Sequence, residues 1–170
     1  MHRIVLRIAV VWTIALAGAC ARDSTPPAST SATPAAADVA HAGYQGELPP
    51  LPAVQFASAR PAPLTRAAYE FAARHPDVLR HVPCFCGCER HGHGNNEDCF
   101  VASRERDGRP VWSPHGIGCG ICIDVAREAA RMHAAGASVA EIRAAIDQKY
   151  ATEYSTHTPT PPVAHSSSPH

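Results

Sequence analysis

The stretch Pro83-Cys84-Phe85-Cys86-Gly87-Cys88 opens a region that ends with Gly118-Cys119-Gly120-Ile121-Cys122. Cys99 lies between these two blocks, so six of the seven cysteines in the 170-residue chain fall between positions 84 and 122. Four histidines lie in or beside the same region, namely His81, His91, His93 and His115. No other part of the sequence concentrates reactive side chains in this way. We therefore expect the fold and the chemistry of the chain to be organised around these thiols.

The spacing of the thiols indicates metal binding. Alternate side chains of an extended segment share one face, so Cys84, Cys86 and Cys88 project together. Paired C-x-C spacings are typical of chains that wrap several thiolates around a soft metal, whereas a single structural zinc more often uses C-x₂₋₄-C spacing. Cys119 and Cys122 lie at the start of a predicted helix, whose positive dipole end favours thiolate. Soft thiolate ligands select Cu(I) and zinc.

Two other interpretations of the cysteines stay open. Exported proteins occupy compartments in which disulfides form, and six cysteines allow three bridges in fifteen ways. Cys84, Cys86 and Cys88 are too close in sequence to bridge one another comfortably, so each bridge would need a distant partner. In the third interpretation Cys119-Gly120-Ile121-Cys122 is a C-x-x-C redox pair, although the strands of a thioredoxin-like fold are not predicted around it.

Helical patterns flank the cysteine-rich region. Before it, Thr65 is a predicted N-cap for a helix over 66–75, which Pro76 ends or bends. After it, Ile121, Val125, Ala129 and Met132 recur at helical spacing, and Gly136 lies where a helix C-terminal glycine is expected. Ser138 and Glu141 form a capping box for a second helix with an apolar stripe at Val139, Ile142, Ile146 and Tyr150. A short hairpin is predicted around the turn Asp107-Gly108.

We therefore predict a mainly α protein, with a small cysteine-rich helical domain over residues 65–151 and an irregular Cys/His loop region within it. Residues 21–62 are dominated by Ala, Pro, Ser and Thr, so residues 20–64 are predicted to be a disordered linker. The Thr- and Pro-rich residues 152–170 are predicted to be a disordered tail. A core of this size often relies on disulfides or metal.

Residues 1–19 have the pattern of a lipoprotein-type signal peptide. Arg3 and Arg7 precede an apolar stretch from Ile8 to Ala17, which is too short for a membrane span of about 20 residues. Leu16-Ala17-Gly18-Ala19-Cys20 resembles a bacterial lipobox, in which Cys20 becomes the lipid-carrying first residue. The sequence thus predicts an exported protein anchored to a membrane on the periplasmic or outer cell-surface side. Ordinary cleavage, with Cys20 removed or left as a stray thiol, is the alternative.

The bulk composition excludes other classes of function. The formal net charge is zero and the pI is about 7.2, which gives no electrostatic basis for a nucleic-acid partner. No Ser/His/Asp set, phosphate-binding loop or pair of carboxylates occurs in a context that supports catalysis, so we predict a protein that is not an enzyme.

Several blocks resemble a bacterial family named for its motif, the PCYCGC-motif lipoproteins. The motif is Pro83-Cys84-Phe85-Cys86-Gly87-Cys88, with Phe85 in place of the tyrosine. Further matching blocks follow in order: Gly92-His93, Asp98-Cys99-Phe100-Val101, Val111-Trp112 with His115-Gly116, Cys119-Gly120-Ile121-Cys122, Glu141-Ile142-Arg143 through Tyr150, and the Thr-Pro tail. The resemblance covers roughly residues 65–162. It implies an exported, lipid-anchored protein, and the function of the family is not established.

The sequence as a whole favours a lipoprotein that binds a soft metal ion, Cu(I) first and zinc second, for metal handling or resistance. The predicted ligands are Cys84, Cys86, Cys88, Cys99, Cys119, Cys122, His93 and His115, and Cys20 is the predicted lipidation site. His93 and His115 are included because they lie in the cysteine-rich stretch and match the family blocks. The alternatives are a disulfide-stapled, non-enzymatic interaction module and, third, a thiol redox protein.

Overall fold

The computed structural model describes residues 43–163, so the predictions for residues 1–42, including Cys20, and for 164–170 lie outside the described residues. The long helices are α2 (Ala62–Arg74), α5 (Gly120–Ala134) and α6 (Val139–Tyr150). The shorter elements are α3 (Pro76–Leu79), η1 (Cys88–His91), η2 (Glu97–Cys99), β1 (Val101–Arg104), β2 (Pro110–Trp112) and α4 (His115–Gly118). The predicted mainly α class, with a cysteine-rich loop region, is confirmed.

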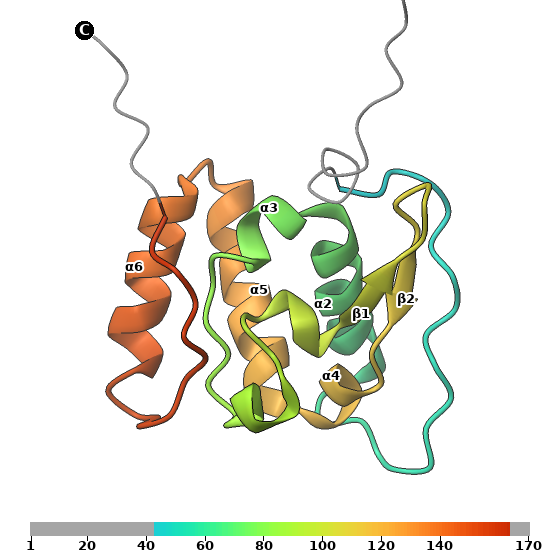
Figure 1. Cartoon of the computed structure of the whole chain (residues 1–170), viewed down its shortest axis with the longest axis horizontal. Coiled ribbons are helices and arrows are strands. Elements are labelled where there is room, and N and C mark those ends of the chain that lie inside the picture. Colours follow the sequence, from blue (N-terminus) through green and yellow to red (C-terminus); the bar gives the residue numbers. More distant parts are fainter. Residues whose placement is uncertain (1–42, 164–170) are drawn as a thin grey trace, which may run out of the picture. The chain divides into compact units, whose positions relative to one another are not determined.

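Helix α5 is the central element of the core. It packs against α2 on one side and α6 on the other, as Figure 1 shows. Val125 and Ala129 of its predicted apolar stripe are fully buried, and Ile121 and Met132 pack half-buried at its edge. Buried side chains of the neighbouring helices complete the core, namely Ala68, Tyr69, Ala72, Ile142 and Ile146. The 3.6-residue period of the sequence therefore places α5 correctly.

The start of α6 confirms the predicted capping box. The Ser138 hydroxyl accepts a hydrogen bond from the Glu141 backbone N–H, and the Glu141 carboxylate accepts one from the Ser138 backbone N–H. Gly136 precedes it with φ of +85°, as expected of a glycine after a helix end. Residues 135–138 therefore join α5 to α6 by a short loop with its terminal backbone groups satisfied.

Ile146 gives a test of the helical core. Ile146 is fully buried and Ala144 is exposed on the same helix. Ile146→Ala is expected to lower the free energy of unfolding by about 2–5 kcal/mol, because it removes buried methyl groups and leaves a cavity. Ala144→Ser is the control, with an expected loss below about 0.5 kcal/mol. Urea unfolding of the two variants measures the difference, and equal losses would contradict the assigned phase of α6.

Helix α2 begins earlier than predicted. Its first residue is Ala62 and its N-cap is Pro61, so Thr65 is a buried residue within the helix and not its cap. Pro63 in the first turn explains the earlier start, because proline suits the first turn of a helix, where backbone N–H groups lack partners. The Thr65 hydroxyl bonds instead to the Arg60 carbonyl and to Ser58. The predicted effect of Pro76 is confirmed, since α2 ends at Arg74 and α3 begins at Pro76.

The predicted hairpin is formed by β1 and β2, which pair antiparallel with Val101 opposite Trp112. Tyr69 of α2 fixes the hairpin to the helices. Its ring meets Phe100 and Trp112 edge-on at centroid distances of 5.1 and 5.4 Å, and its hydroxyl donates to the Ser113 carbonyl at 2.6 Å. These contacts place the residues that flank the hairpin beside the cysteine-rich loop.

The predicted linker boundary at residue 64 is corrected by the structure. Residues 43–61 have no regular secondary structure, but they pack along the domain as an extended segment (Figure 1). Leu51 and Val54 contact the core, and the Trp112 indole N–H donates to the Pro49 carbonyl at 3.1 Å. A proline-rich segment that lacks internal pairing is held here by contacts to distant residues, which composition does not reveal. Within residues 43–163, no helix combines the length and apolarity needed to cross a membrane.

The predicted tail boundary is also corrected, because residues 155–163 run back along the cysteine loop. Thr158 is fully buried, and its backbone N–H donates to the Cys84 carbonyl at 2.9 Å. The Cys84 backbone N–H donates in return to the Thr158 hydroxyl at 2.9 Å. Thr160 adds a hydrogen bond from its hydroxyl to the Gly94 carbonyl. Residues 155–163 therefore join Cys84, at the start of the cysteine-rich loop, to Gly94 further along it.

Thr158 gives a test of this clasp. Thr158→Val keeps the size of the side chain but leaves the buried Cys84 N–H without a partner. We expect a loss of about 1–3 kcal/mol in the free energy of unfolding. Thr156→Val, at an exposed position of the same segment, is the control and should change stability little. Denaturant titration of the reduced, metal-free protein measures both, and an unchanged midpoint for Thr158→Val would show that the tail does not hold the loop.

Candidate metal centre

The sulfur of Cys84 lies at the centre of a thiol cluster. Its Sγ is 3.0 Å from that of Cys88, 3.2 Å from those of Cys86 and Cys99, and 3.3 Å from that of Cys122. These sulfurs come from the loop after α3, from η2 and from the first turn of α5. Residues up to 38 positions apart therefore converge on one point.

The loop that carries Cys84, Cys86 and Cys88 reaches this geometry through a turn at Gly87. Gly87 adopts φ of +72°, and Cys88 begins the single turn η1 directly after it. A side chain at Gly87 would be strained at this φ, so glycine allows Cys88 to fold back onto Cys84. The prediction that the three C-x-C thiols project together is confirmed, because the Cys86 and Cys88 sulfurs lie 3.2 and 3.0 Å from that of Cys84 and the left-handed turn at Gly87 brings Cys88 there.

Helix α5 brings the second cysteine pair to the cluster. Cys119 is the N-cap residue of α5 and Cys122 lies in its first turn, as the sequence predicts. The Cys122 sulfur is 3.5 Å from that of Cys86. The backbone N–H groups of the first helical turn lack helical acceptors, and this end of the helix stabilises negative charge on a thiolate.

The structure places both predicted histidines beside the thiols. His93 Nδ1 lies 3.5 Å from the Cys99 sulfur, and His115 Nε2 lies 3.7 Å from the Cys86 sulfur. The two imidazole rings are 5.0 Å apart between centroids. His93 and His115 thus form one side of the cluster, where they can serve as ligands or orient ligands.

Three overlapping sets of four side chains have the geometry of a metal site within residues 43–163. They are Cys84, Cys86, Cys99 and Cys122; Cys86, Cys88, Cys99 and His115; and Cys86, His115, Cys119 and Cys122. In each set the ligand atoms all lie within 4.8 Å of one another. Cys86 belongs to all three sets, and each of the six clustered cysteines belongs to at least one.

The donor set fits a soft metal ion. Four sulfurs bound tetrahedrally at about 2.3 Å would be about 3.8 Å apart, so the contacts of the Cys84 sulfur need to lengthen by less than an ångström. Thiolate and imidazole donors suit Cu(I) and zinc, and no carboxylate of the kind that calcium or magnesium requires belongs to any of the three sets. The residues present can therefore hold a metal ion.

Protons are unevenly distributed over the cluster. Hydrogen bonding with neighbouring thiols, that with Cys122 foremost, lowers the pKa of Cys84 to about 4. Contacts with Cys119 and other thiols hold the pKa of Cys86 far below its usual range. The pKa of Cys99 is raised by its hydrogen bond with Cys122, by further thiol contacts and by burial. The cluster thus combines thiolates with thiols whose protons an incoming cation must displace.

The same geometry bears on the disulfide interpretation. All six clustered cysteines are free thiols in the structure. The Cys84 sulfur has four sulfur neighbours at similar distances, whereas a disulfide network would divide the six sulfurs into three pairs. For the redox interpretation, the sheet of residues 43–163 is a two-stranded hairpin, which does not provide the βαβ context of a thioredoxin-like C-x-x-C.

His115 belongs to two of the three ligand sets, whereas His93 and the other histidines of residues 81–133 lie outside them. His91 is exposed, and the His81 carbonyl accepts a hydrogen bond from Arg143. His133 stacks near His75 at a centroid distance of 4.5 Å, away from the thiols and in the last turn of α5. Sequence reasoning missed Thr158, whose hydrogen bonds fix Cys84. The Thr-Pro block of the tail, which matches the family resemblance, was the available signal.

The fold and the site together define a class: a small helical protein whose core includes a cluster of six cysteines that, with His115, is able to hold a metal ion. A family described as "Protein of unknown function with PCYCGC motif" matches residues 8–163. The chain belongs to this family. Searches among curated proteins and among solved structures return no match to the chain. The predicted resemblance is thereby confirmed at the level of the family.

Proposed function

We propose that this protein binds soft metal ions, Cu(I) first and zinc second, through its clustered thiolates. The observation that carries the proposal is the clustering of six sulfurs, in which that of Cys84 has four others within 3.3 Å. The ligands proposed are the six cysteines, with His93 and His115 at the side of the cluster. Metal handling or resistance is the role we propose for this binding.

The surplus of thiolates favours Cu(I) over a single zinc ion. One tetrahedral zinc needs four ligands, but the three overlapping sets offer six sulfurs and the imidazole of His115. Shared thiolates suit a cluster of several Cu(I) ions, because thiolate sulfur is soft and can bridge two metal ions. Zinc is the second candidate because each set taken alone has the four Cys or His ligands of a zinc site.

The experiment that tests this proposal is a titration of the reduced chain with Cu(I) under anaerobic conditions. We expect stoichiometric uptake of more than one Cu(I) per chain, accompanied by release of protons as thiols ionise. Zinc titration in parallel ranks the two metals. Protein isolated directly from its native compartment is then analysed for free thiols and metal by mass spectrometry. Three intact disulfides and no metal in that sample would reject metal binding in favour of the disulfide-stapled module.

We also propose that the protein is exported and anchored by a lipid on Cys20, on the periplasmic or outer cell-surface side of a membrane. The support is the sequence: a positively charged start, a short apolar stretch and small residues before Cys20. Cys20→Ser is expected to move the protein from the membrane fraction to the soluble fraction, as measured by fractionation and immunoblotting. Retention of the variant on membranes would reject the lipobox. Cys119→Ser, in the same fractionation, should stay membrane-bound.

A further inference from the structure

A surface pocket opens onto one side of the thiol cluster. Its volume is about 540 Å³, and the lining residues are Phe56, Ser113, Pro114, His115, Gly118 and Cys119. Two of these, His115 and Cys119, belong together to one of the three ligand sets, whose other members are Cys86 and Cys122. The pocket therefore connects solvent with one particular edge of the candidate metal centre.

The exposure of the thiols also indicates this edge of the cluster. Cys84, Cys88, Cys99 and Cys122 are 0–1 % exposed, whereas Cys86 and Cys119 are only partly buried. His115 is likewise partly buried. Because a metal ion and its incoming ligand must reach a sulfur lone pair directly, the four buried thiols are poor points of entry.

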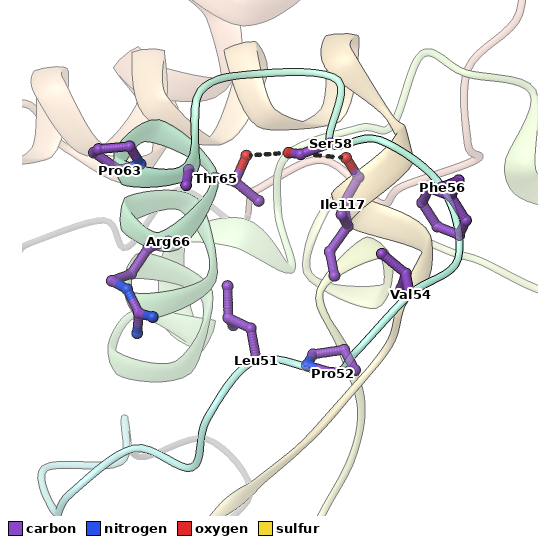
Figure 2. A pocket seen from close by; sticks show the side chains of 10 residues that line it. Leu51, Pro52, Val54, Phe56, Ser58, Pro63, Thr65, Arg66 and Ile117 are labelled. Carbon is purple, nitrogen blue, oxygen red and sulfur yellow. Dashed lines mark hydrogen bonds between the residues drawn. The ribbon is translucent and has the colours of Figure 1, made fainter.

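A strap over residues 54–60 borders this pocket. The strap is held to α4 by a hydrogen bond from the Ala59 N–H to the Ile117 carbonyl at 2.9 Å, and Arg60 pairs with Asp124 of α5. Ser58 bonds to Thr65 and to the Ile117 carbonyl, and Phe56 projects from the same strap, as Figure 2 shows. The strap is thus fixed at residues 58–60, next to the pocket that Phe56 lines.

Phe56 lies at the rim of the pocket. Its side chain is 52 % exposed although it is large and apolar, and its ring lies against Gly118. A Cβ at Gly118 would come within 3.0 Å of the Phe56 ring, so the absence of a side chain allows the ring to approach the residue next to Cys119. Phe56 therefore limits the width of the approach to Cys119.

We propose that this pocket is the port through which the cluster exchanges metal, with Cys119 and His115 as the first ligands to gain or release it and Phe56 as the residue that restricts access. This inference rests on the proposed function. The partner is a soft sulfur donor, namely a small thiol or an exposed thiolate of a metal carrier. Cys84, in contrast, is fully buried and its backbone is held by Thr158, so the pocket reaches the candidate centre at its less buried ligands.

Exchange at the port is a ligand substitution without electron transfer. The thiolate of the incoming donor forms a bond to Cu(I), and the bond between Cu(I) and Cys119 Sγ then breaks. The proton that the incoming thiol loses is balanced by the proton that Cys119 gains. Copper stays in the Cu(I) state throughout, so no oxidant or reductant is needed. Cys86 retains the ion during the substitution because it is common to all three ligand sets.

The lining of the port restricts the chemistry of the partner. None of its six lining residues is a lysine, arginine, aspartate or glutamate, and the nearby Arg60 and Asp124 neutralise each other. A lining without acidic side chains, lysine or arginine gives little ion-pair steering of an approaching donor. Metal transfer to a thiol donor is therefore expected to change less than twofold between low and physiological salt.

The first test needs no metal. The reduced full-length chain is pulsed with iodoacetamide, and labelling at each cysteine is followed by peptide mapping. Among the six clustered cysteines, Cys119 and Cys86 should be alkylated at least tenfold faster than the four buried ones. Phe56→Ala should accelerate labelling of Cys119 at least threefold and Phe56→Trp should slow it. Val111→Ala is the control, because Val111 is the other exposed large apolar residue within residues 43–163 and lies outside this pocket.

The second test follows transfer of Cu(I) from the loaded chain to excess bathocuproine disulfonate by stopped flow. Phe56→Ala should bind the same number of Cu(I) ions as the unaltered chain and release them at least threefold faster. Uniform labelling of the six thiols, or a Phe56→Ala variant that binds normally and transfers at the unaltered rate, would overturn the port. A chain that binds no Cu(I) would instead reject the proposed function, and the labelling experiment would still test the port as an access route to the thiols.

Discussion

Replacing Cys86 by serine is expected to weaken Cu(I) binding more than any other single change at a clustered cysteine. Cys86 is the one ligand common to the three four-residue sets, so its loss removes a donor from every possible arrangement of the metal within residues 43–163. A serine hydroxyl is a hard donor that does not replace a thiolate for Cu(I). Changes to residues that only orient a ligand lower metal affinity about 10–100-fold, so loss of this shared ligand should lower it by more than about 100-fold.

Competition with a Cu(I) chelator of known affinity measures this effect in the reduced chain. Cys119→Ser is the matched control, because Cys119 is also partly buried but belongs to a single ligand set. It should lower affinity much less than Cys86→Ser does. Cys20→Ser, at the cysteine outside the cluster, should leave affinity unchanged.

Circular dichroism of Cys86→Ser should retain most of the helical signal, because α5 and α6 bury their own apolar stripes. Equal affinities for Cys86→Ser and Cys119→Ser would show that the three sets do not share a ligand.

Local sequence patterns predict much of this protein. The period of Val125 and Ala129 in one helix, and of Ile142 and Ile146 in the next, locates the helical core because burial on a helix repeats every 3.6 residues. The capping box at Ser138 fixes the start of α6 for a similarly local reason. These signals need only a few neighbouring residues, so a single sequence contains them in full.

The organisation of the site depends on contacts between distant residues and is less visible in the sequence. The list of candidate ligands follows from residue type and position, but the sharing of Cys86 among three sets requires the turn at Gly87 and the placement of α5. Thr158 shows the same limit. It belongs to a polar, proline-containing segment with the composition of disorder, yet it is held by paired hydrogen bonds to Cys84, 74 positions away.

Glu97 is the clearest case of a residue that its local context does not explain. The run Asn95-Asn96-Glu97-Asp98 has the composition of a solvated polar turn, but the Glu97 side chain is only 6 % exposed. Its carboxylate oxygens lie 2.7 Å from Arg104 Nη2 and 2.8 Å from Arg80 Nε. Arg104 is 7 % exposed and also donates to the carbonyls of Ala72 and Ala73 near the end of α2. Glu97 thus joins η2, which carries Cys99, to Arg104 of β1 and to Arg80 at the end of α3.

Glu97→Ala is expected to lower the free energy of unfolding by about 3–5 kcal/mol, because removing one partner of a buried ion pair leaves the other charge uncompensated. The uncompensated charge is that of Arg104, which its carbonyl contacts solvate only in part. Since Glu97 and Cys99 share the short turn η2, the variant should also loosen Cys99 and lower Cu(I) affinity. The midpoint of urea unfolding of the reduced, metal-free chain measures the stability, and chelator competition measures the affinity.

Glu105→Ala separates the effect of burial from that of charge. Glu105 pairs with Arg109 at 2.6 Å, a distance close to that of the Glu97–Arg104 pair. The side chains of Glu105 and Arg109, however, are both more than 40 % exposed. Water screens an exposed pair and solvates the arginine that is left behind, so this variant should unfold near the midpoint of the unaltered chain. Its Cu(I) affinity should also be unchanged, because Glu105 lies outside η2 and outside the ligand sets. A Glu97→Ala variant as stable as Glu105→Ala would mean that Arg104 finds solvent when its partner is removed, and that the buried ion pair does not fix the Cys99 turn.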